Sequence, residues 1–295
     1  MPIRLAENFR AIFYAPYYAT HALGFYAREG VEVELLTSSN PGDAVPKLVD
    51  GSIDITWGGP MRVMKAHDQD PLSPLVSFCE VVTRDPFFLL GRKTARPFDL
   101  KDLPGLRFAS VSEVPTPWMC LQHDLREAGI DPNALKRISD RTMGQNYAAL
   151  QAGEIDVMQA FEPFPSMAAN DGAADVLYTQ SARGPTVYTA FIATREACAR
   201  RRTEFTAMTR ATAKMQQWLY ATPIEELAAA TAQFFPDVST DILVSALRRY
   251  RDAGLWAHDT AMSRPGFDRL ARSLHSGRFI ARMPGYDECV EKSLD

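Results

Sequence analysis

The most constraining feature of this sequence is a segment that occurs twice. Residues 44–60 read AVPKLVDGSIDITWGGP, and residues 148–163 read AALQAGEIDVMQAFEP. In each copy the end of an expected helix is followed by a glycine, Gly51 or Gly153, and then by an Ile-Asp pair that opens an apolar run. The two glycines and the two aspartates are separated by the same number of residues, so one register without insertions aligns the copies. Because glycine ends a helix in a conformation that other residues reach only at a cost, each copy predicts a helix, a turn and a strand. The repeat therefore predicts two similar α/β lobes.

Both copies end in a short loop, at residues 57–60 in the first and 161–163 in the second. Ligands of open α/β sheets bind beyond the carboxyl ends of the strands, so we expect these loops to form walls of a site between the lobes. The alternative is that the shared pattern is only a common way to pass from a helix to a strand.

Length and composition restrict the class of protein. A chain of 295 residues exceeds what one hydrophobic core usually serves, which also favours two lobes. The net charge is −4, and no segment combines many basic residues with aromatic ones, so nucleic acid is not an expected partner. No apolar run approaches the roughly 18 residues of a membrane helix, so we expect no membrane insertion. The cysteines are scattered without paired spacing, so we expect buried thiols rather than disulfides or a metal site: Cys79, Cys120, Cys198 and Cys289.

The expected elements alternate between strands and helices up to residue 194 and are almost wholly helical afterwards. We expect the strand at 187–193 to rejoin the first sheet. This gives a first lobe of residues 1–91 and 185–295, including a helical tail, and a second lobe of residues 92–184. The chain then crosses between the lobes near 90–92 and 182–188, and we expect ligand to close the lobes about these crossings.

Several short motifs, none specific alone, occur in an order and spacing that resemble a known family. They are FYAPYYA at 13–19, GFYAREGVEV at 24–33, SNPGD at 39–43, GSID at 51–54, DLPG at 102–105 and EP at 162–163. The order resembles the solute-binding proteins of ABC importers with the type II periplasmic-binding fold, in the branch that handles sulfonates, taurine and thiamine-pyrimidine precursors. The resemblance implies two α/β lobes with a hinge and a helical C-terminal tail. It also implies capture of a small molecule without chemistry, and docking of the closed form on a membrane transporter.

The location depends on how the chain begins. The resemblance implies a periplasmic protein, but the sequence runs from Met1-Pro2 straight into a strand-like segment, and we expect no secretion leader in it. We expect the periplasm if a leader has been removed, and the cytoplasm if the chain is full length.

The same resemblance includes one enzyme, the pyrimidine-precursor synthase of thiamine biosynthesis. It implies a lysine and a histidine four residues apart after the first Gly-x-Ile-Asp strand, and a cysteine-rich block before the strand that returns to the first lobe. Here these positions hold Gly58, Arg62 and the cysteine-free residues 184–188. General catalytic motifs such as G-x-S-x-G and H-E-x-x-H are also missing from the sequence. We therefore expect a protein that is not an enzyme and needs no cofactor, neither pyridoxal phosphate nor iron.

The expected ligand site combines residues of two kinds. The aromatic rings that could stack on a flat ligand are Tyr14, Trp57, Trp118 and Tyr188. The polar residues and glycines are Asn8, Arg10, Ser39, Asn40, Gly58, Gly59, Thr116, Gln145 and Glu162. Helix starts near Asn40 and Thr116, the latter expected as an N-cap, would point N–H donors at the cleft and favour anions or acceptors. For Trp57 and Trp118 the alternative is core packing.

The role of Glu162 distinguishes the expected ligand classes. A carboxylate that faces the cleft prefers an amino group or a protonated ring nitrogen, so the leading expectation is a pyrimidine or another heteroaromatic amine. In the alternative, Glu162 pairs with an arginine such as Arg10. The second ligand class is a sulfonate or carboxylate held by Arg10 and the helix starts. A leaderless cytosolic enzyme or ligand sensor that keeps this fold is the third hypothesis.

Overall fold

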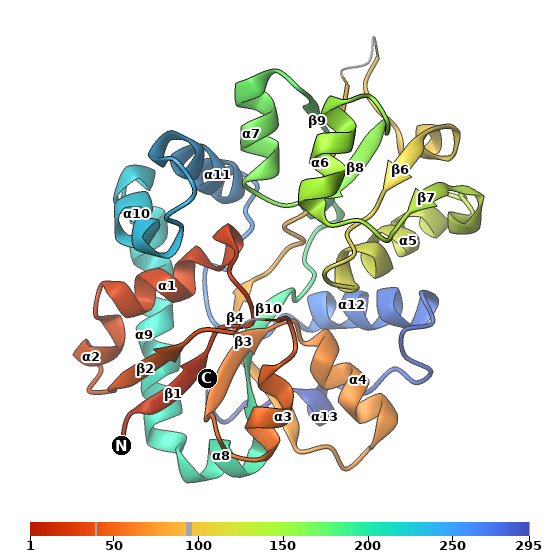
Figure 1. Ribbon diagram of the computed structural model, residues 1–295. Coiled ribbons are helices and arrows are strands. Elements are labelled where there is room, and N and C mark those ends of the chain that lie inside the picture. Colours follow the sequence, from red (N-terminus) through yellow and green to blue (C-terminus); the bar gives the residue numbers. More distant parts are fainter. Residues whose placement is uncertain (39, 93–95, 295) are drawn as a thin grey trace.

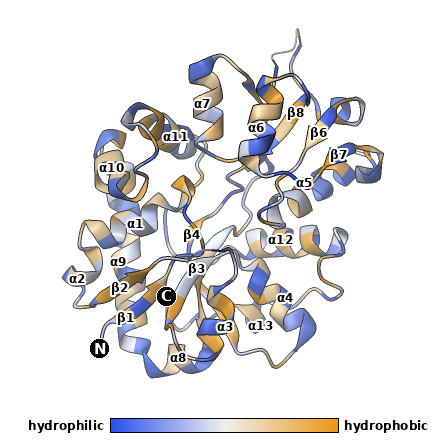
Figure 2. Cartoon of the chain, viewed as in Figure 1, coloured by the Kyte–Doolittle hydropathy of each residue, from blue (hydrophilic) through white to orange (hydrophobic). Residues whose placement is uncertain are grey.

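A computed structural model of the protein describes residues 1–38, 40–92 and 96–294. It contains two five-stranded sheets flanked by helices, and a C-terminal series of helices (Figure 1). The helices carry hydrophilic and hydrophobic residues side by side, as expected when one face of a helix packs on a sheet (Figure 2). Of the helices in this part of the chain, none is both long enough and apolar enough to cross a membrane.

The first sheet has the strand order β2-β1-β3-β10-β4. Its strands are β1 (Ile3–Ala6), β2 (Val33–Leu36), β3 (Ile55–Gly58), β4 (Leu75–Val82) and β10 (Thr189–Thr194). Strand β1 is parallel to β2 and β3, whereas β10 runs antiparallel to both of its neighbours. The late strand β10 therefore rejoins the first sheet, as the sequence predicts.

The second sheet has the strand order β7-β6-β8-β5-β9. Its strands are β5 (Phe88–Gly91), β6 (Arg107–Ala109), β7 (Lys136–Ile138), β8 (Val157–Ala160) and β9 (Asp175–Thr179). Strand β6 is parallel to β7 and β8, and β5 runs antiparallel to β8 and β9. The two sheets thus share one arrangement, in which β5 takes the place that β10 has in the first sheet. This confirms the two similar α/β lobes predicted from the repeat.

The first crossing between the lobes lies earlier than expected. Strand β5 belongs to the second sheet because Leu90 pairs with Met158 of β8 and Val176 of β9. The crossing is therefore the segment 83–87, and the expectation of a crossing near 90–92 is wrong. The second connection runs from the end of β9 to the start of β10, over residues 180–188. The strands of the second sheet begin with β5 at residue 88 and end with β9 at residue 179. The second lobe therefore begins before the expected boundary at residue 92.

Helices α1–α4 accompany the first sheet and α5–α7 the second. They are α1 (Ala15–Ala22), α2 (Phe25–Arg28), α3 (Ala44–Val49), α4 (Met61–Gln69), α5 (Thr116–Glu127), α6 (Met143–Gln151) and α7 (Phe164–Asp171). Short 3-10 helices lie at Ile12–Tyr14, Leu100–Gly105, Pro132–Ala134, Gln180–Arg183 and Ala232–Phe234. Helix α3 begins at Ala44, so Pro46 falls in its first turn, where proline is tolerated.

The C-terminal helices form a tail that contacts both lobes. They are α8 (Arg195–Arg200), α9 (Arg202–Ala221), α10 (Ile224–Thr231), α11 (Thr240–Asp252), α12 (Arg264–Ser276) and α13 (Tyr286–Cys289). Helix α9 packs on α1, α2 and β4 of the first lobe, whereas α11 contacts α7 and α12 contacts α5 of the second lobe (Figure 1). The tail therefore spans the junction between the lobes instead of covering the first lobe alone.

In the first lobe the repeated aspartate anchors the start of the sheet. The carboxylate of Asp54 accepts hydrogen bonds from the backbone N–H of Arg4 (3.0 Å) and from its Nε (3.2 Å). The Nη2 of Arg4 donates to the carbonyl oxygen of Gly51 (2.7 Å), and Gly51 has a φ of 75°. The glycine and the aspartate of the repeat thus both bind the first residues of β1.

The second lobe repeats this anchor with equivalent residues. The carboxylate of Asp156 accepts from the backbone N–H (2.8 Å), Nε (3.0 Å) and Nη2 (2.7 Å) of Arg107. The Nη2 of Arg107 also donates to the carbonyl oxygen of Gly153 (2.9 Å), whose φ is 73°. The two anchors differ in exposure, because 36% of the Asp156 side chain is accessible but only 4% of the Asp54 side chain.

This difference in exposure predicts that aspartate-to-asparagine substitutions at the two anchors lower the free energy of unfolding by different amounts. Asp54→Asn should lower the free energy of unfolding by about 1 to 2 kcal/mol, because it weakens charge-assisted bonds in a buried setting. Asp156→Asn should cost less than about 1 kcal/mol, since an exposed ion pair contributes little. Urea denaturation of both variants measures the difference, and each variant serves as the matched control for the other. Equal losses would contradict the role assigned to burial.

A buried carboxyl group, Glu80 on β4, ties the tail to the first sheet. Its carboxylate accepts a hydrogen bond from the backbone N–H of Ser263 (2.7 Å), and its own backbone N–H donates to the carbonyl oxygen of Thr260 (2.9 Å). Gln216 of α9 donates to the backbone carbonyl of Glu80 (2.9 Å). Burial raises the pKa of Glu80 from 4.5 to about 7, and the charge of Asp259 adds to this.

The raised pKa predicts a loss of stability with rising pH. The unfolded chain ionises Glu80 near pH 4.5, whereas the folded protein keeps it protonated up to about pH 7. The contribution of this group is therefore fully present below pH 4.5 and is lost as the pH rises to about 7, by up to about 3 kcal/mol. Glu80→Gln cannot ionise at this position, so only the native protein should lose stability here as the pH rises. Urea denaturation from pH 4 to 8 should therefore show the unfolding free energy of the variant rising relative to that of the native protein. A difference that does not change with pH would contradict this assignment.

A buried cluster of charges joins the two connections between the lobes. Asp85 in the first connection accepts hydrogen bonds from the backbone N–H of Phe87 (2.9 Å) and from Nε2 of Gln180 (3.1 Å), and it forms an ion pair with Arg183 in the second. The Nε of Arg183 also donates to both carboxylate oxygens of Asp124 on α5, at 3.0 and 2.9 Å. No more than 7% of any of the three charged side chains is exposed. Burial alone lowers the pKa of Arg183, but the charges of Asp85 and Asp124 raise it well above its ordinary value.

Candidate functional site

A small cavity of about 30 Å³ lies between the lobes and forms the candidate ligand site. Its lining comes from both lobes and from the first connection: Asn8, Phe9, Phe13, Tyr14, Gly59, Met61, Arg62, Phe87, Val114, Pro115, Thr116 and Tyr188. Most of these residues follow the carboxyl ends of β1, β3 and β6, where the sequence places the site, whereas Phe87 and Tyr188 directly precede β5 and β10. Five of the predicted site residues belong to this set: Asn8, Tyr14, Gly59, Thr116 and Tyr188.

Aromatic rings close the cavity on one side. Phe161, from the loop at the end of β8, lies 5.4 Å from the ring of Phe13 and 5.2 Å from that of Phe87, in edge-to-face contact. Phe9 contacts Tyr14 in the same geometry at 5.4 Å. Because Phe161 belongs to the second lobe and Phe13 to the first, these contacts hold the lobes together beside the cavity. A ligand that enters the cavity must therefore separate the two lobes.

Arg62, on the first turn of α4, supplies the positive charge in the cavity wall. Within residues 1–38, 40–92 and 96–294, no carboxylate forms an ion pair with its guanidinium. Burial lowers the pKa of Arg62, and the charge of Asp43 and the hydroxyl of Tyr14 only partly offset this effect. The guanidinium packs against Gly42, where a Cβ atom would overlap it. Gly42 has a φ of 97°, so a side chain at this position would be strained as well as obstructive.

Asn8 fixes the position of this wall. Its Oδ1 accepts a hydrogen bond from the backbone N–H of Gly42 (3.2 Å), and its Nδ2 donates to the hydroxyl of Tyr14 (3.2 Å). Asn8 follows β1, so one side chain joins the end of that strand to the loop that carries Gly42 and to the ring of Tyr14. Burial raises the pKa of Tyr14 to about 12, so its hydroxyl stays protonated and can donate to an acceptor.

Tyr188 provides a hydroxyl without a protein partner. It lies just before β10, only 6% of the residue is exposed, and its hydroxyl has no hydrogen-bond partner among the described residues. Burial raises the pKa of Tyr188 well above its ordinary value, so the group is a donor and not an anion. A buried hydroxyl without a partner carries a desolvation cost, which a bound acceptor would remove.

Two helices begin at the cavity, one in each lobe. Met61 and Arg62 open α4, and Pro115 and Thr116 stand at the start of α5. The first-turn N–H groups of a helix have no partner within the helix and lie at the positive end of its dipole. Thr116 is the first helical residue and its side chain makes no capping bond, so the predicted N-cap role is wrong.

Glu162 is occupied by the tail and does not line the cavity. Its carboxylate accepts hydrogen bonds from Nε of Arg249 (2.7 Å) and from the backbone N–H and hydroxyl of Ser166 (both 3.0 Å). Its backbone N–H donates to the hydroxyl of Tyr250 (2.9 Å). The sequence-based alternative of an arginine partner describes this arrangement, but the partner is Arg249 of α11, not Arg10.

Arg10 likewise binds groups outside the interlobe cavity. Its guanidinium donates to both carboxylate oxygens of Glu7 (2.9 and 3.0 Å) and to the carbonyl oxygen of Phe234 (2.8 Å), and it lies over the ring of Tyr18. Arg10 and Glu162 instead line a separate hollow of about 370 Å³ where the tail meets both lobes. The predicted pairing of Arg10 with an anion in the cleft therefore has no support in this geometry.

The other predicted site residues lie outside the cavity lining. Trp57 is buried and stacks on Tyr17 at 4.8 Å, and Trp118 packs in the second lobe beside Phe108, with Arg137 over its ring. Core packing, the alternative stated for both tryptophans, is thus what the structure shows.

The remaining predictions concern backbone positions and caps. Gln145 is exposed and caps its own helix by accepting from the backbone N–H of Thr142 (2.8 Å). Asn40 donates to Asp43 (3.3 Å), and no helix begins there because α3 starts at Ala44. Gly58 ends β3 next to the cavity, where a Cβ atom would contact Asn8 at 3.7 Å. Ser39 lies outside the described residues.

Arg62 is the most important residue that the sequence analysis missed as a ligand group. The sequence carried a signal for it, because Gly-Gly-Pro before Met61-Arg62 marks a helix start directly after a strand. The comparison with the synthase also led to this position, but only as the place of an absent histidine.

Relatives of known sequence agree with the architecture. "Putative binding protein YtlA" of Bacillus subtilis (strain 168) is 23% identical over 294 residues, which cover 99% of this chain and 88% of YtlA. The 4-amino-5-hydroxymethyl-2-methylpyrimidine phosphate synthase of Schizosaccharomyces pombe is 27% identical over 101 residues, only 34% of this chain and 29% of the synthase.

A solved structure and a family model complete the comparison. The periplasmic aliphatic sulphonate binding protein SsuA of Escherichia coli superposes with a TM-score of 0.78 at 15% identity, over 99% of this chain and 98% of SsuA. This likeness confirms the periplasmic-binding fold expected from the resemblance. The family model described as NMT1/THI5 like matches residues 12–226. The chain therefore belongs to the NMT1/THI5-like family.

Proposed function

We propose that the protein is the solute-binding component of an ABC importer and that it captures a small organic anion, a sulfonate or a carboxylate, between its lobes. The observation that carries this proposal is the guanidinium of Arg62, which lines the interlobe cavity without a carboxylate partner among the described residues. Arg62 is partly buried, and a cation held partly out of solvent without a counter-ion is destabilised, so an anionic ligand that closes on it removes part of that cost.

Two further features of the cavity and one comparison favour an acceptor-rich ligand. The starts of α4 and α5 approach it from opposite lobes and add positive potential. The unpartnered hydroxyl of Tyr188 supplies a donor. SsuA, which shares the fold, is named for binding aliphatic sulphonates. An amine ligand has less support, because Glu162, the carboxylate expected to bind it, is engaged by Arg249.

Transport rather than catalysis is the activity we infer. Gly58 and Arg62 occupy the positions at which the resemblance implies the lysine and the histidine of the synthase, and the match to that enzyme spans about a third of this chain. A binding protein of this kind works with a membrane permease, and its place is the periplasm. Folds of this type also serve enzymes, so this part of the proposal depends on the site residues rather than on the fold.

The proposal is tested by calorimetry with ligands of similar size and different charge. We expect ethanesulfonate or butyrate to bind and an aminopyrimidine to give no heat of binding. Binding of the aminopyrimidine alone would overturn the anion assignment and restore an amine. Conversion of any of these molecules by the purified protein would overturn the transport assignment.

A further inference from the structure

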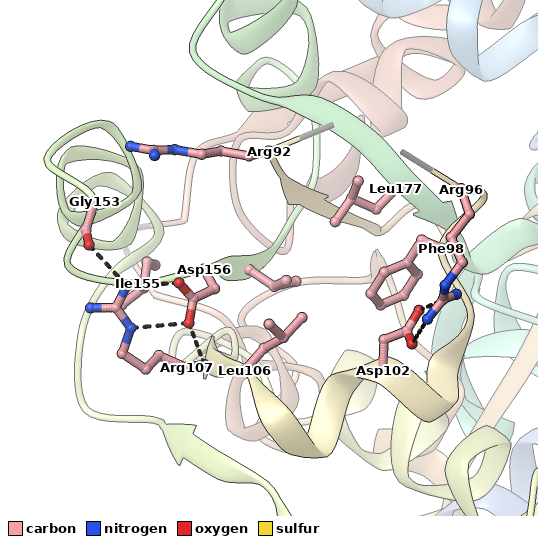
Figure 3. A pocket seen from close by; sticks show the side chains of 11 residues that line it. Arg92, Arg96, Phe98, Asp102, Leu106, Arg107, Gly153, Ile155, Asp156 and Leu177 are labelled. Carbon is pink, nitrogen blue, oxygen red and sulfur yellow. Dashed lines mark hydrogen bonds and ion pairs between the residues drawn. The ribbon is translucent and has the colours of Figure 1, made fainter. Parts of the chain in front are cut away.

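A second and much larger cavity lies in the second lobe, away from the interlobe cleft. Its volume is about 670 Å³, and we call it the far-end pocket, lined chiefly by Arg92, Phe98, Leu106, Ile155, Asp156 and Leu177 (Figure 3). Arg107 and Val157, the first residues of β6 and β8, also line it. The interlobe cavity lies beyond the opposite ends of these strands. The two cavities are therefore at opposite edges of the second sheet.

The walls of the far-end pocket are apolar. Phe98, Leu106 and Leu177 point into it from three different segments and remain only partly buried, while Ile155 is fully covered. In Figure 3 these side chains face one another across the hollow. The volume lies within the range of about 300 to 1,000 Å³ that is typical of small-molecule sites. Such walls favour a ligand with an apolar body.

The rim of the pocket carries three arginines, and one of them, Arg92, forms no ion pair within the described residues. Arg107 is held by Asp156 and by the carbonyl oxygen of Gly153, and Arg96 is paired with Asp102 (Figure 3). Arg92 extends over the same rim with Nη2 close to Gly153, where a Cβ atom would lie 3.2 Å from it. Within the described parts of the chain, no carboxylate forms an ion pair with Arg92. Its charge acts on Asp156 only at longer range, and lowers the pKa of that group.

The internal repeat shows why this edge is open. In the first lobe the equivalent anchor, Asp54, is 4% exposed, and Arg201 at the junction of α8 and α9 lies near enough to lower its pKa. Strand β10 leads directly into α8, so the tail covers part of that edge and leaves only a smaller hollow of about 260 Å³ beside Gly51 and Ile53. In the second lobe the equivalent strand is β5, which leads into Arg92, and no helix of the described chain covers the edge in the same way. The exposed Asp156 is the consequence.

We propose that the far-end pocket binds an amphipathic organic anion, with the apolar body between Phe98, Leu106 and Leu177 and the carboxylate on Arg92. This ligand need not be the transported solute, and the proposal does not depend on the function assigned to the interlobe cavity. The pocket combines apolar walls with an arginine on its rim that has no ion-pair partner among the described residues, so a carboxylate with a chain of several carbons matches both features. A neutral alcohol of the same length would match only the walls.

The test uses octanoate as the probe and octanol as its neutral counterpart. Calorimetry should detect octanoate binding to the intact protein, and octanol should bind more weakly. Arg92→Met should weaken octanoate binding about threefold to tenfold, the range between an exposed and a charge-assisted contact, and should leave octanol binding unchanged. Amide NMR shifts induced by octanoate should centre on Ile155 and Leu177.

Two control variants separate this pocket from the rest of the surface and from the interlobe cavity. Arg210→Met removes an exposed arginine of α9 far from the pocket and should not change octanoate affinity. Arg62→Met removes the cation of the interlobe cavity and with it carboxylate binding there, so Arg92→Met should weaken octanoate binding in this background as it does in the native protein. Octanoate binding that is insensitive to Arg92→Met, or lost with Arg62→Met, would overturn the proposal. So would NMR shifts that centre on the interlobe cavity, or an absence of octanoate binding.

Discussion

Replacing Arg183 by methionine should lower the free energy of unfolding by about 3 to 5 kcal/mol, among the largest single effects expected in this chain. Arg183 is buried between Asp85 and Asp124, and it bonds to Asp124 through Nε at 3.0 and 2.9 Å. Without the guanidinium, two carboxylates remain buried close to each other, and neither has a positive partner. The loss comes mainly from this uncompensated charge and not from the net value of the ion pairs.

Controls distinguish this explanation from a general effect of losing an arginine. Arg210→Met, at an exposed ion pair on α9, should cost less than about 1 kcal/mol. Adding Asp85→Asn to Arg183→Met should recover part of the loss, because it removes one of the two stranded charges. Urea denaturation of the four proteins gives the comparison. A loss below 1 kcal/mol for Arg183→Met, or a double variant less stable than Arg183→Met alone, would contradict the stranded-charge explanation.

The position of this cluster also bears on how the lobes move. Asp85 lies in the first connection between the lobes and Arg183 in the second, so the ion pair ties the two connecting segments together. Hinge motion is absorbed by a few residues where the lobes are joined. Because the cluster fixes these segments relative to each other, we expect the bending to occur in the residues on either side of it. The sequence places the second connection in this region but gives no sign of its link to Asp85.

Local patterns in the sequence were sufficient to predict the two lobes. The expected strand at 187–193 is β10, the first five residues of which are buried. The glycine and aspartate of the repeat perform the same structural task in each lobe, at Arg4 and at Arg107. These features are visible because each depends on residues close in the chain or on a pattern that occurs twice.

Contacts between distant segments could not be predicted in the same way. The apolar run of β5 fits an inner position of either sheet, and only its pairing with Met158 of β8 and Val176 of β9 decides its place. The carboxylate of Glu162 accepts a hydrogen bond from Arg249, which is 87 residues away on a helix of the tail. The guanidinium of Arg62 can lie in the wall of the interlobe cavity because Gly42, in a different loop, leaves room for it. In each case the partner is chosen by packing between elements, which neither spacing nor composition reports.

Replacing Arg62 by methionine should weaken binding of ethanesulfonate by tenfold to hundredfold, or about 1.5 to 3 kcal/mol. The guanidinium is the only charged group in the lining of the interlobe cavity within the described chain, so the anion loses its one charge-assisted partner. Methionine keeps much of the apolar stem but loses the contact that the guanidinium makes with Gly42, so the stability of the variant should be measured alongside its affinity. Arg62→Lys should fall between the native protein and Arg62→Met, because it keeps the charge without the planar fork.

Glu162→Gln provides the decisive comparison in the same calorimetric series. If Glu162 faced the ligand, its neutralisation would change ethanesulfonate affinity more than Arg62→Met does. Because the carboxylate is instead bound to Arg249 and Ser166, we expect the variant to lose stability at the contact between the tail and the second lobe, and to keep most of its affinity. Arg10→Met should behave likewise, since its guanidinium serves Glu7 and Phe234. Full affinity in Arg62→Met, together with a large loss in Arg10→Met, would move the anion out of the interlobe cavity and place it beside Arg10.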